Sequence, residues 1–428
     1  MLDIKFIREN AELVAMGAQK KRIDFDVKKL IEVDDKRKEI SQKLEKKRAK
    51  QNEVSLEVAK LGQAGNIAEK RKLIEEMQPL KEQMQALEAE LKEIMIEWQK
   101  LMVAVPNIPD MSVPDGEDES GNVELKTWGN IPKFNFTPKN NMDLMLAHDM
   151  VDTERGTKVA GFRGYFLKND AALLQFALWQ FVQDFFRKKS EIGEKWTPMI
   201  VPSLVKREVL LGTGYIPQGE EDLYKTQDGD FLSGTAEVAT MGYYMDEILD
   251  KKDLPIKMIS FADSFRREAG SHGRDTKGIL RVHEFYKMEQ VVLCEASHEL
   301  SVKYHEELTN NAEEIMQALK IPYRVVVNCG GDLGLGQVKK YDIEAWMPSE
   351  NKYRETHSSS YFHDFQTRRL GIRYRDDDGK LKFVHSLNNT ALSGRPLLAI
   401  IENNQQADGS IVIPEVLRPY MGGKEKVG

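Results

Sequence analysis

The sequence predicts an α+β protein in which a hairpin of two long helices precedes a domain that mixes strands and helices. Three observations predict it. Up to about residue 105, apolar positions recur in steps of three and four, which is the spacing of a coiled coil. A stretch rich in Pro, Gly and acidic residues follows. From about residue 136, strand-like runs alternate with helix-like runs.

The chain of 428 residues is long enough for two domains. We expect residues 1–105 to form a helical hairpin arm, residues 106–135 a linker, and residues 136–428 a second domain. The net charge of −7 argues against a protein that coats nucleic acid over its whole surface, but it allows a local basic patch.

The cysteines and the apolar runs narrow the class of protein further. Cys294 and Cys329 form no close pair, so the sequence indicates neither a disulfide framework nor a zinc site. The N-terminal residues resemble neither a signal peptide nor a transit peptide, and no apolar run is long enough to cross a membrane. We therefore expect a protein of the cytoplasm with no membrane partner.

Two runs of seam positions predict the hairpin. They fall in residues 30–61 and 73–101, and the glycine-containing stretch 62–66 between them predicts the turn. At 1.5 Å per residue, the first helix would be roughly 45–50 Å long. Pro79 lies inside the second run, where the register continues, so we expect a bend and not a helix end. The seam positions are Leu30, Val33, Arg37, Ile40, Leu44, Lys47, Gln51, Val54, Val58 and Leu61, then Leu73, Met77, Leu80, Met84, Leu87, Leu91, Ile94, Trp98 and Leu101.

The first helix is rich in cations over residues 36–50, and polar side chains replace apolar ones at several of its seam positions. A charge run alone is more often the solvated surface of a coiled coil. The alternative is an arm that grips the phosphates of RNA, because clustered cations on one rod attract a polyanion. The segment by itself leaves both interpretations open. The cations that we expect to contact RNA are Arg37, Lys43, Lys47 and Arg48.

The chemically richest stretch is residues 264–290, SFRREAGSHGRDTKGILRVHEFYKMEQ. It predicts a strand with Arg266 and Glu268 on one face, a glycine-rich loop, and an antiparallel strand from about residue 279 that carries Phe285 and Glu289. An arginine fork suits an α-phosphate, and an aromatic ring can cover a purine. Without further context, a buried Arg–Glu pair is as often structural as functional.

This stretch resembles motif 2 of the seryl-tRNA synthetases, a class II family. Three other segments resemble family motifs in the expected order: WTPMIVPSLVKREVLLGTGYIP (196–217) motif 1, GTAEVA (234–239) the serine-binding loop, and RPLLAIIENNQQADGSIVIPEVLRPYM (395–421) motif 3. The hairpin and the segment VPNIP match as well, so the resemblance spans nearly the whole chain. It implies a class II core with an antiparallel sheet flanked by helices, of the bacterial type.

The resemblance also implies the reaction. The family activates L-serine with ATP to seryl-adenylate and transfers serine to the 3′ end of serine tRNA, and by the same resemblance to selenocysteine tRNA. It implies a homodimer with Pro202 at the interface, in which the arm of one subunit reaches tRNA bound at the other's active site. ATP and Mg²⁺ are the implied cofactors, and zinc is not expected.

The resemblance assigns roles to individual residues. Arg266 bridges the serine carboxylate and the α-phosphate, Arg395 contacts the γ-phosphate, and Glu355 and Ser358 hold Mg²⁺. The implied catalytic residues are Arg266, Glu268 and Arg395. The implied serine-binding residues are Thr235, Ala236, Glu237, Arg266, Glu289 and Thr390. The implied ATP-binding residues are Arg266, Arg267, Glu268, Val282, Phe285, Glu355, Thr356, His357, Ser358 and Arg395.

The expected chemistry needs no strong base, because the attacking carboxylate is already ionised. Catalysis then rests on positioning and charge neutralisation. We therefore expect His272 and His357 to be loop or supporting groups. A site that hydrogen-bonds a hydroxyl rejects alanine strongly, whereas threonine is rejected only by its size.

Plainer interpretations of single residues and of the whole chain stay open. Taken alone, Glu355 is as well explained as a surface carboxylate, and Thr390 better as a turn residue. The commoner family version has serine at Thr390, and the segment from there to Arg395 is one residue shorter than usual. A ligase that charges a carrier protein would lack the long hairpin. A non-enzymatic coiled-coil protein would not be expected to retain the catalytic residues.

Overall fold

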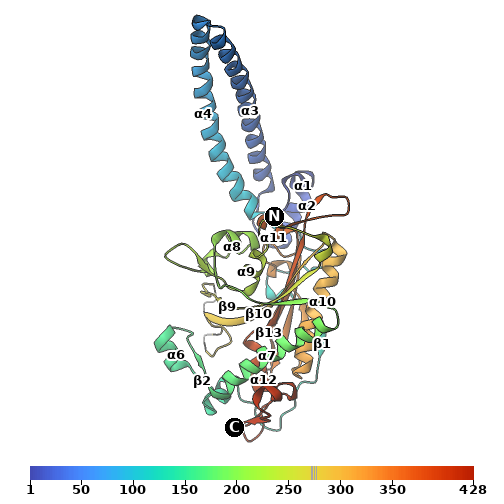
Figure 1. The fold of residues 1–428 in the computed structure, drawn as a ribbon. Helices are drawn as coiled ribbons and strands as arrows, with labels where there is room; N and C mark the ends of the chain where they lie inside the picture. The colour runs from blue at the N-terminus through green and yellow to red at the C-terminus, as the bar shows by residue number, and fades with distance from the viewer. Residues whose placement is uncertain (271–272, 274, 276) are drawn as a thin grey trace. The chain divides into compact units, whose positions relative to one another are not determined.

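The computed structural model describes residues 1–270, 273, 275 and 277–428, and the chain divides into two compact units (Figure 1). One unit, the arm, comprises residues 3–18 and 24–105. The other, the sheet unit, comprises residues 1–2, 19–23 and 106–428. The short segment 19–23, which lies within the expected arm, therefore belongs to the sheet unit.

The arm is a hairpin of α3 (Val27–Gln63) and α4 (Ile67–Ala104), preceded by α1 (Ile4–Glu9) and α2 (Ala11–Lys20). The side chains of Asp26 and Asn66 cap α3 and α4, each accepting a hydrogen bond from a backbone N–H in the first turn of its helix. Gly65 has a φ of +74° in the connecting turn, a conformation that favours glycine. The predicted hairpin is confirmed.

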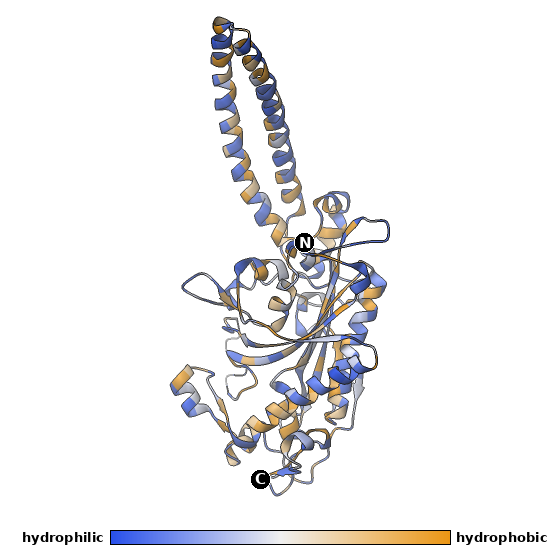
Figure 2. Ribbon diagram, in the orientation of Figure 1, coloured by the Kyte–Doolittle hydropathy of each residue, from blue (hydrophilic) through white to orange (hydrophobic). Residues whose placement is uncertain are grey.

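The predicted seam of the hairpin is confirmed as well, since each seam position is buried or half-buried. The seam is tightest near its base, where Leu30 and Leu44 are buried, and from Lys47 to the end of α3 its positions are only half-buried. Pro79 lies inside α4, which continues through it. Figure 2 shows α3 to be the more hydrophilic helix of the two, as expected from its cation-rich sequence.

The sheet unit is built on an eight-stranded sheet with the order β1-β11-β12-β13-β16-β10-β9-β4. Neighbouring strands are antiparallel except β4 and β9, which are parallel. The stretch 106–135, expected as a linker, contributes the edge strand β1. The bounds are β1 Val123–Trp128, β4 Trp196–Ile200, β9 Ile256–Phe265, β10 Glu284–Cys294, β11 Tyr323–Val327, β12 Lys339–Met347, β13 Lys352–His363 and β16 His385–Leu392.

Helices cover both faces of this sheet, as the alternation along β10 shows. Met288 and Val292 join the main core with α7 (Asn169–Glu191), α10 (His298–Ala318) and α12 (Arg395–Asn403). Val291 and Leu293 join a second core with α9 (Ala236–Gly242) and α11 (Phe365–Leu370). By period two, Lys287 and Glu289 belong to the same face as Val291, so they point toward the α9 side.

Smaller elements complete the sheet unit. The remaining helices are α5 Asn141–Ala147, α6 Thr153–Ala160 and α8 Arg207–Thr213. The remaining strands are β2 Val151–Asp152, β3 Phe166–Leu167, β5 Leu204–Val205, β6 Tyr224–Lys225, β7 Phe231–Leu232, β8 Ile248–Leu249, β14 Arg373–Arg375, β15 Leu381–Phe383, β17 Ile411–Val412 and β18 Lys426–Val427. Across the described residues, no helix has both the length and the apolarity needed to cross a membrane.

Two expectations about the strands around the glycine-rich loop are wrong in detail. β9 ends at Phe265, so Arg266 and Glu268 follow the strand and do not share one of its faces. Glu268 has a φ of +55°, which breaks the two-residue alternation. The second strand begins at Glu284 and not near residue 279. The antiparallel pairing of β9 and β10 is as predicted.

Candidate active site

Two neighbouring cavities lie where β9, β10, β13 and β16 meet. Cavity A, of about 340 Å³, is lined by the loop before β10, by Phe285, and by the junction of β16 with α12. Cavity B, of about 360 Å³, is lined by Glu237 of α9, Glu289 of β10 and the segment 334–337. The two cavities share the lining residues Arg266, Lys287, Gln337 and Ser358.

Arg266 occupies the boundary because of its place directly after β9. Its backbone N–H donates to the carbonyl of His283 at 2.9 Å, which continues the pairing of the two strands by one residue. Its Nε donates to the carbonyl of Gly234 at 3.3 Å, and its guanidinium carbon lies 5.3 Å from the ring centre of Phe285. The fork is thus held between an aromatic ring and a carbonyl, and it lines both cavities.

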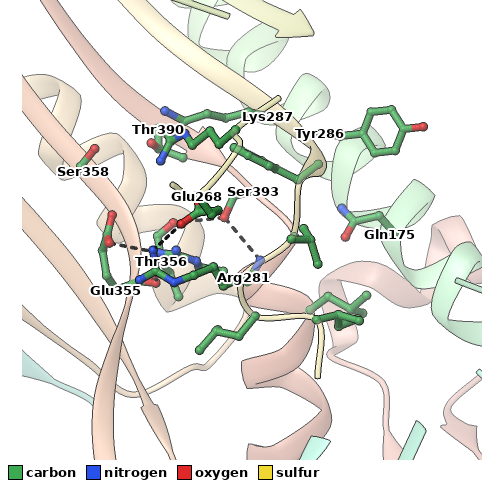
Figure 3. A pocket seen from close by; sticks show the side chains of 18 of the residues that line it. Gln175, Glu268, Arg281, Tyr286, Lys287, Glu355, Thr356, Ser358, Thr390 and Ser393 are labelled. Carbon is green, nitrogen blue, oxygen red and sulfur yellow. Dashed lines mark hydrogen bonds and ion pairs between the residues drawn. The ribbon is translucent and has the colours of Figure 1, made fainter. Parts of the chain in front are cut away.

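Ion pairs fix the charged side chains of cavity A (Figure 3). Arg281 contacts Glu268 at 2.7 Å. Arg395, the first residue of α12, contacts the Glu355 carboxylate at 3.0 Å and donates to the Glu355 carbonyl at 2.9 Å. Burial alone would raise the pKa of Glu355, but Arg395 and Lys340 outweigh it and lower that pKa. Glu355 is therefore an ionised carboxylate on the cavity wall.

A second buried pair, Lys340 and Asp342, interacts electrostatically with Glu355. Lys340 Nζ lies 3.0 Å from Asp342 Oδ2, and Lys340 also lines cavity A. Burial raises the pKa of Asp342 even though Lys340 lies beside it. Cavity A thus carries cations on several sides, and cations so placed attract an anion such as a polyphosphate.

Cavity B contains two buried carboxylates with different environments. Glu237 accepts hydrogen bonds from the Tyr215 hydroxyl at 2.9 Å and from the Gln366 amide at 2.7 Å. Glu289 lies 2.6 Å from Lys287 Nζ, yet burial outweighs this cation and raises the pKa of Glu289 to about 7. A small ligand that carries an ammonium, a carboxylate and a hydroxyl would find complementary groups here.

The structure brings together most of the residues that the sequence singles out. Glu289 and Thr390 are opposite each other in the β10–β16 ladder, but Glu289 lines cavity B and Thr390 lines cavity A. The residues found in cavity A are Arg266, Glu268, Val282, Phe285, Glu355, Thr356, Ser358, Thr390 and Arg395. Those found in cavity B are Glu237, Arg266, Glu289 and Ser358.

Other singled-out residues lie outside both linings. Thr235 caps α9 and its hydroxyl accepts from Lys287 Nζ at 3.3 Å, and Ala236 is buried at the start of that helix. Arg267 is exposed and donates to the Glu221 carbonyl at 3.0 Å. His357 is buried against the Thr356 hydroxyl at 2.8 Å, and burial lowers its pKa to about 4. His272 lies outside the described residues.

Sequence reasoning missed several residues of the cavities. Lys287 could have been identified from the sequence, because it precedes Glu289 by two residues in a strand and therefore lies on the same face as Glu289. Gln337 and Lys340 could not be identified in this way, because tertiary folding brings them to the site from the turn before β12 and from β12 itself. Tyr215 and Gln366, which hold Glu237, likewise come from distant segments.

The four cations expected to contact RNA each have a partner within the arm. Arg37 also lies over the Trp98 ring, with 4.8 Å between its guanidinium carbon and the ring centre. The exposed pairs leave RNA binding possible, because such a pair contributes only about 0–1 kcal/mol and can exchange for a phosphate contact. The partners are Asp34 for Arg37, Glu39 for Lys43, Gln83 for Lys47 and Glu88 for Arg48.

Comparisons with known proteins agree with this geometry. Residues 1–109 match the family model of the seryl-tRNA synthetase N-terminal domain, and residues 224–404 match that of the class II tRNA synthetase core domain (G, H, P, S and T). Serine–tRNA ligase of Deinococcus radiodurans is 44% identical, covering 100% of this chain and 99% of its own length. That of Acetivibrio thermocellus is 47% identical, covering 99% of each chain.

Solved structures extend the similarity to the whole fold. The crystal structure of seryl-tRNA synthetase from Pyrococcus horikoshii complexed with ATP has a TM-score of 0.89 and 37% identity, covering 100% of this chain and 99% of that one. The structure of cytoplasmic serine–tRNA ligase from Naegleria fowleri in complex with AMP has a TM-score of 0.85 and 30% identity. It covers 100% of this chain and 98% of that one.

Proposed function

The chain belongs to the seryl-tRNA synthetase family, and on that premise we propose how its two cavities and its arm divide the reaction. The protein activates L-serine with ATP and charges tRNA with the serine. Our proposal is that cavity A binds ATP and cavity B binds serine. The observation that carries it is that Arg266 lines both cavities, at the point where the serine carboxylate and the α-phosphate must meet.

In the first step, a carboxylate oxygen of serine forms a bond to the α-phosphorus. The bond between that phosphorus and the oxygen leading to the β-phosphate breaks, and pyrophosphate leaves. Arg266 offsets the charge of the reacting phosphate and orients the carboxylate, so no proton needs to be moved. In the second step, a hydroxyl at the 3′ end of tRNA attacks the carbonyl carbon of the adenylate. The bond from that carbon to the phosphate oxygen breaks, AMP leaves, and the hydroxyl proton is released to solvent.

Serine selectivity follows from the two carboxylates of cavity B. Glu237, held by Tyr215 and Gln366, would accept from the serine ammonium. Glu289 would bind the serine hydroxyl, and Thr390, its partner in the ladder, would contribute from the side of cavity A. An amino acid without the hydroxyl would leave a buried polar group unpaired, which costs far more than a lost contact.

ATP would bind cavity A with its base against the Phe285 ring and Val282, its α-phosphate at Arg266 and its γ-phosphate at Arg395. Glu268 would hold the adenine end while Arg281 neutralises its charge. Four predicted residues lie outside the linings of both cavities, and we propose that they support their neighbours instead of touching a ligand. These are Thr235, Ala236, Arg267 and His357.

A magnesium ion fits the donors of cavity A. Mg²⁺ prefers hard oxygen ligands, and Glu355 and Ser358, three residues apart in β13, offer a carboxylate and a hydroxyl that both line cavity A. The lowered pKa of Glu355 keeps that carboxylate ionised. When bound, the ion would supply positive charge that offsets the negative charge of the phosphates. No part of the proposal requires zinc.

The remaining parts would serve partners. We propose that the arm, within residues 1–105, binds serine tRNA through its cations, that residues 106–135 join it to the core, and that residues 136–428 carry the chemistry.

We also propose a homodimer, because β4 lies at an edge of the sheet and exposes Ile200 beside an exposed Phe176 of α7. The cytoplasm, where tRNA is charged, is the proposed location.

Serine-dependent exchange of pyrophosphate into ATP tests the assignment of the cavities. Arg266→Ala should lower the exchange rate by at least about a hundredfold, because an electrostatic contact to the reacting group is lost. Arg375→Ala, at an exposed position at the end of β14, is the matched control and should exchange like the unmodified chain. Full exchange by Arg266→Ala, or no serine dependence in the unmodified chain, would overturn the proposal.

A further inference from the structure

Lys21 is a buried cation of the sheet unit. Only 3% of its surface is exposed, although lysine is among the residues least often buried. It belongs to segment 19–23, the short N-terminal piece that is part of the sheet unit. Burial of a cation removes its hydration, which is costly unless nearby anions or hydrogen-bond acceptors compensate for it.

Three backbone carbonyls compensate for the lost hydration of Lys21. Lys21 Nζ donates to the carbonyls of Gly334 at 3.0 Å, Leu335 at 2.8 Å and Gln337 at 2.6 Å. In the described part of the chain, Lys21 has no carboxylate partner. Burial lowers the pKa of Lys21, but three carbonyl acceptors call for three N–H donors, and only the ammonium form supplies them.

These carbonyls belong to the segment that lines cavity B. Gly334, Leu335, Gly336 and Gln337 all contribute to that lining, and Gln337 lines cavity A as well. The Gln337 side chain closes the loop on itself, because its Oε1 accepts from the Gly334 N–H at 2.6 Å. Its Nε2 donates to the Ser360 hydroxyl at 2.8 Å. The position of this loop therefore sets the size of the cavity.

Asn107 completes the attachment from a second direction. Its side-chain amide donates to the Gly336 carbonyl at 3.0 Å, and its backbone N–H donates to the Leu335 carbonyl at 2.9 Å. Each carbonyl from Gly334 to Gln337 thus accepts from Lys21, from Asn107 or from both. Lys21 and Asn107 therefore fix all four carbonyl groups, and neither of these two residues lines cavity A or cavity B.

We propose that Lys21 is a positioning residue for serine: by holding the Gly334–Gln337 loop, it keeps cavity B small enough to favour serine over threonine. The inference rests on the assignment of cavity B to serine made above. Lys21 touches no substrate and acts through the loop. Threonine differs from serine by one methyl group, so a small displacement of a cavity wall is enough to weaken its exclusion.

The test compares Lys21→Met with Lys21→Arg and with Lys20→Met in the full-length chain. Lys20→Met is the matched control, because it removes the same charge one position earlier without touching the loop carbonyls. Serine-, threonine- and ATP-dependent pyrophosphate exchange is measured for each, after serine dependence of the unmodified chain has been established. Without that dependence, the assignment of cavity B fails and the role of Lys21 is not at issue.

Lys21→Met should raise KM for serine by roughly ten- to hundredfold and reduce the serine-to-threonine ratio of kcat/KM, with KM for ATP nearly unchanged. Lys21→Arg, which keeps charge and donors, should recover part of the ratio. If KM for serine and KM for ATP increased equally while the serine-to-threonine ratio of kcat/KM stayed unchanged, the role of Lys21 would be merely structural and the proposal would be overturned. An unaltered KM for serine in Lys21→Met would do the same.

If Lys21→Met fails to fold, Asn107→Ala provides the second route, because it releases the same loop from the other side. It should shift KM for serine and the threonine ratio in the same direction. A folded Asn107→Ala variant with unchanged values for both amino acids would refute control of the cavity by the loop.

Discussion

Lys287 Nζ lies 2.6 Å from the Glu289 carboxylate, and both side chains are buried on the same face of β10. A cation this close ordinarily lowers the pKa of a carboxyl group, but the pKa of Glu289 is not lowered. Burial outweighs the attraction and raises the pKa of Glu289 from 4.5 to about 7. The group proposed to bind the serine hydroxyl therefore titrates near neutral pH.

This titration predicts a pH dependence of stability. A carboxyl whose pKa is raised on folding contributes stability that is fully present below the unfolded value of 4.5 and is lost as the pH rises through about 7. Relative to Glu289→Gln, the wild-type melting temperature should fall between pH 4.5 and 7 and then level off. Thermal unfolding of both proteins across this range is the measurement, with Glu247→Gln on the exposed surface as control. A difference that stays constant with pH would contradict the assignment.

Deleting the outer part of the arm should separate the two steps of the reaction. A chain without residues 30–101 retains the cavities and segment 19–23, so serine-dependent pyrophosphate exchange should stay within about twofold, while tRNA charging should fall below detection. A chain without residues 1–105 loses Lys21 as well and should show an increased KM for serine. Parallel loss of exchange and charging in the first deletion would refute this division of labour.

Charge reversal on α3 should weaken tRNA binding without affecting ATP or serine. Arg48→Glu should raise KM for tRNA and reduce the slope of log affinity against log salt by about 0.7–0.9, the value for one lost phosphate contact. Glu88→Gln is the informative partner, because it releases Arg48 from its ion pair and should leave binding equal or tighter. If neither variant changes KM for tRNA, the cations belong to a solvated coiled-coil surface.

Glu355→Gln should increase the requirement for magnesium. Removal of the carboxylate charge should raise the Mg²⁺ concentration for half-maximal exchange by at least about tenfold at fixed ATP. Glu350→Gln, just before β13, removes a carboxylate that pairs with Lys352 and should leave the titration unchanged. Identical magnesium curves for all three proteins would exclude Glu355 as a ligand.

The local parts of the fold were predictable, because they depend on neighbours in the chain. The seam from Leu30 to Leu101 follows from a repeat that each helix carries by itself, and the turn follows from Gly65. The pairing of β9 with β10 follows from two strands around one loop. The position of Glu268 was not predictable, since β9 ends at Phe265 and a left-handed φ at Glu268 breaks the two-residue alternation.

The site was predictable where the family motifs carry it and not elsewhere. Arg266, Glu355 and Arg395 line cavity A as the resemblance implies. Gln337 and Lys340 were missed, because no spacing in the sequence relates them to the glycine-rich loop. Lys21 carries no signal at all: among the many lysines of the N-terminal region, only the tertiary structure shows that this one is buried.

The distance in sequence between Lys21 and its carbonyls has a consequence for synthesis on the ribosome. Gln337 is translated 316 residues after Lys21. At a translation rate of about 5–20 residues per second, Lys21 is synthesised roughly 15–60 s before the last of its acceptors. The arm depends mostly on contacts close in the chain and can form during that interval. Cavity B, in contrast, cannot take its final shape until most of the polypeptide has been made, so a chain whose translation stops early has an arm but lacks the proposed serine site.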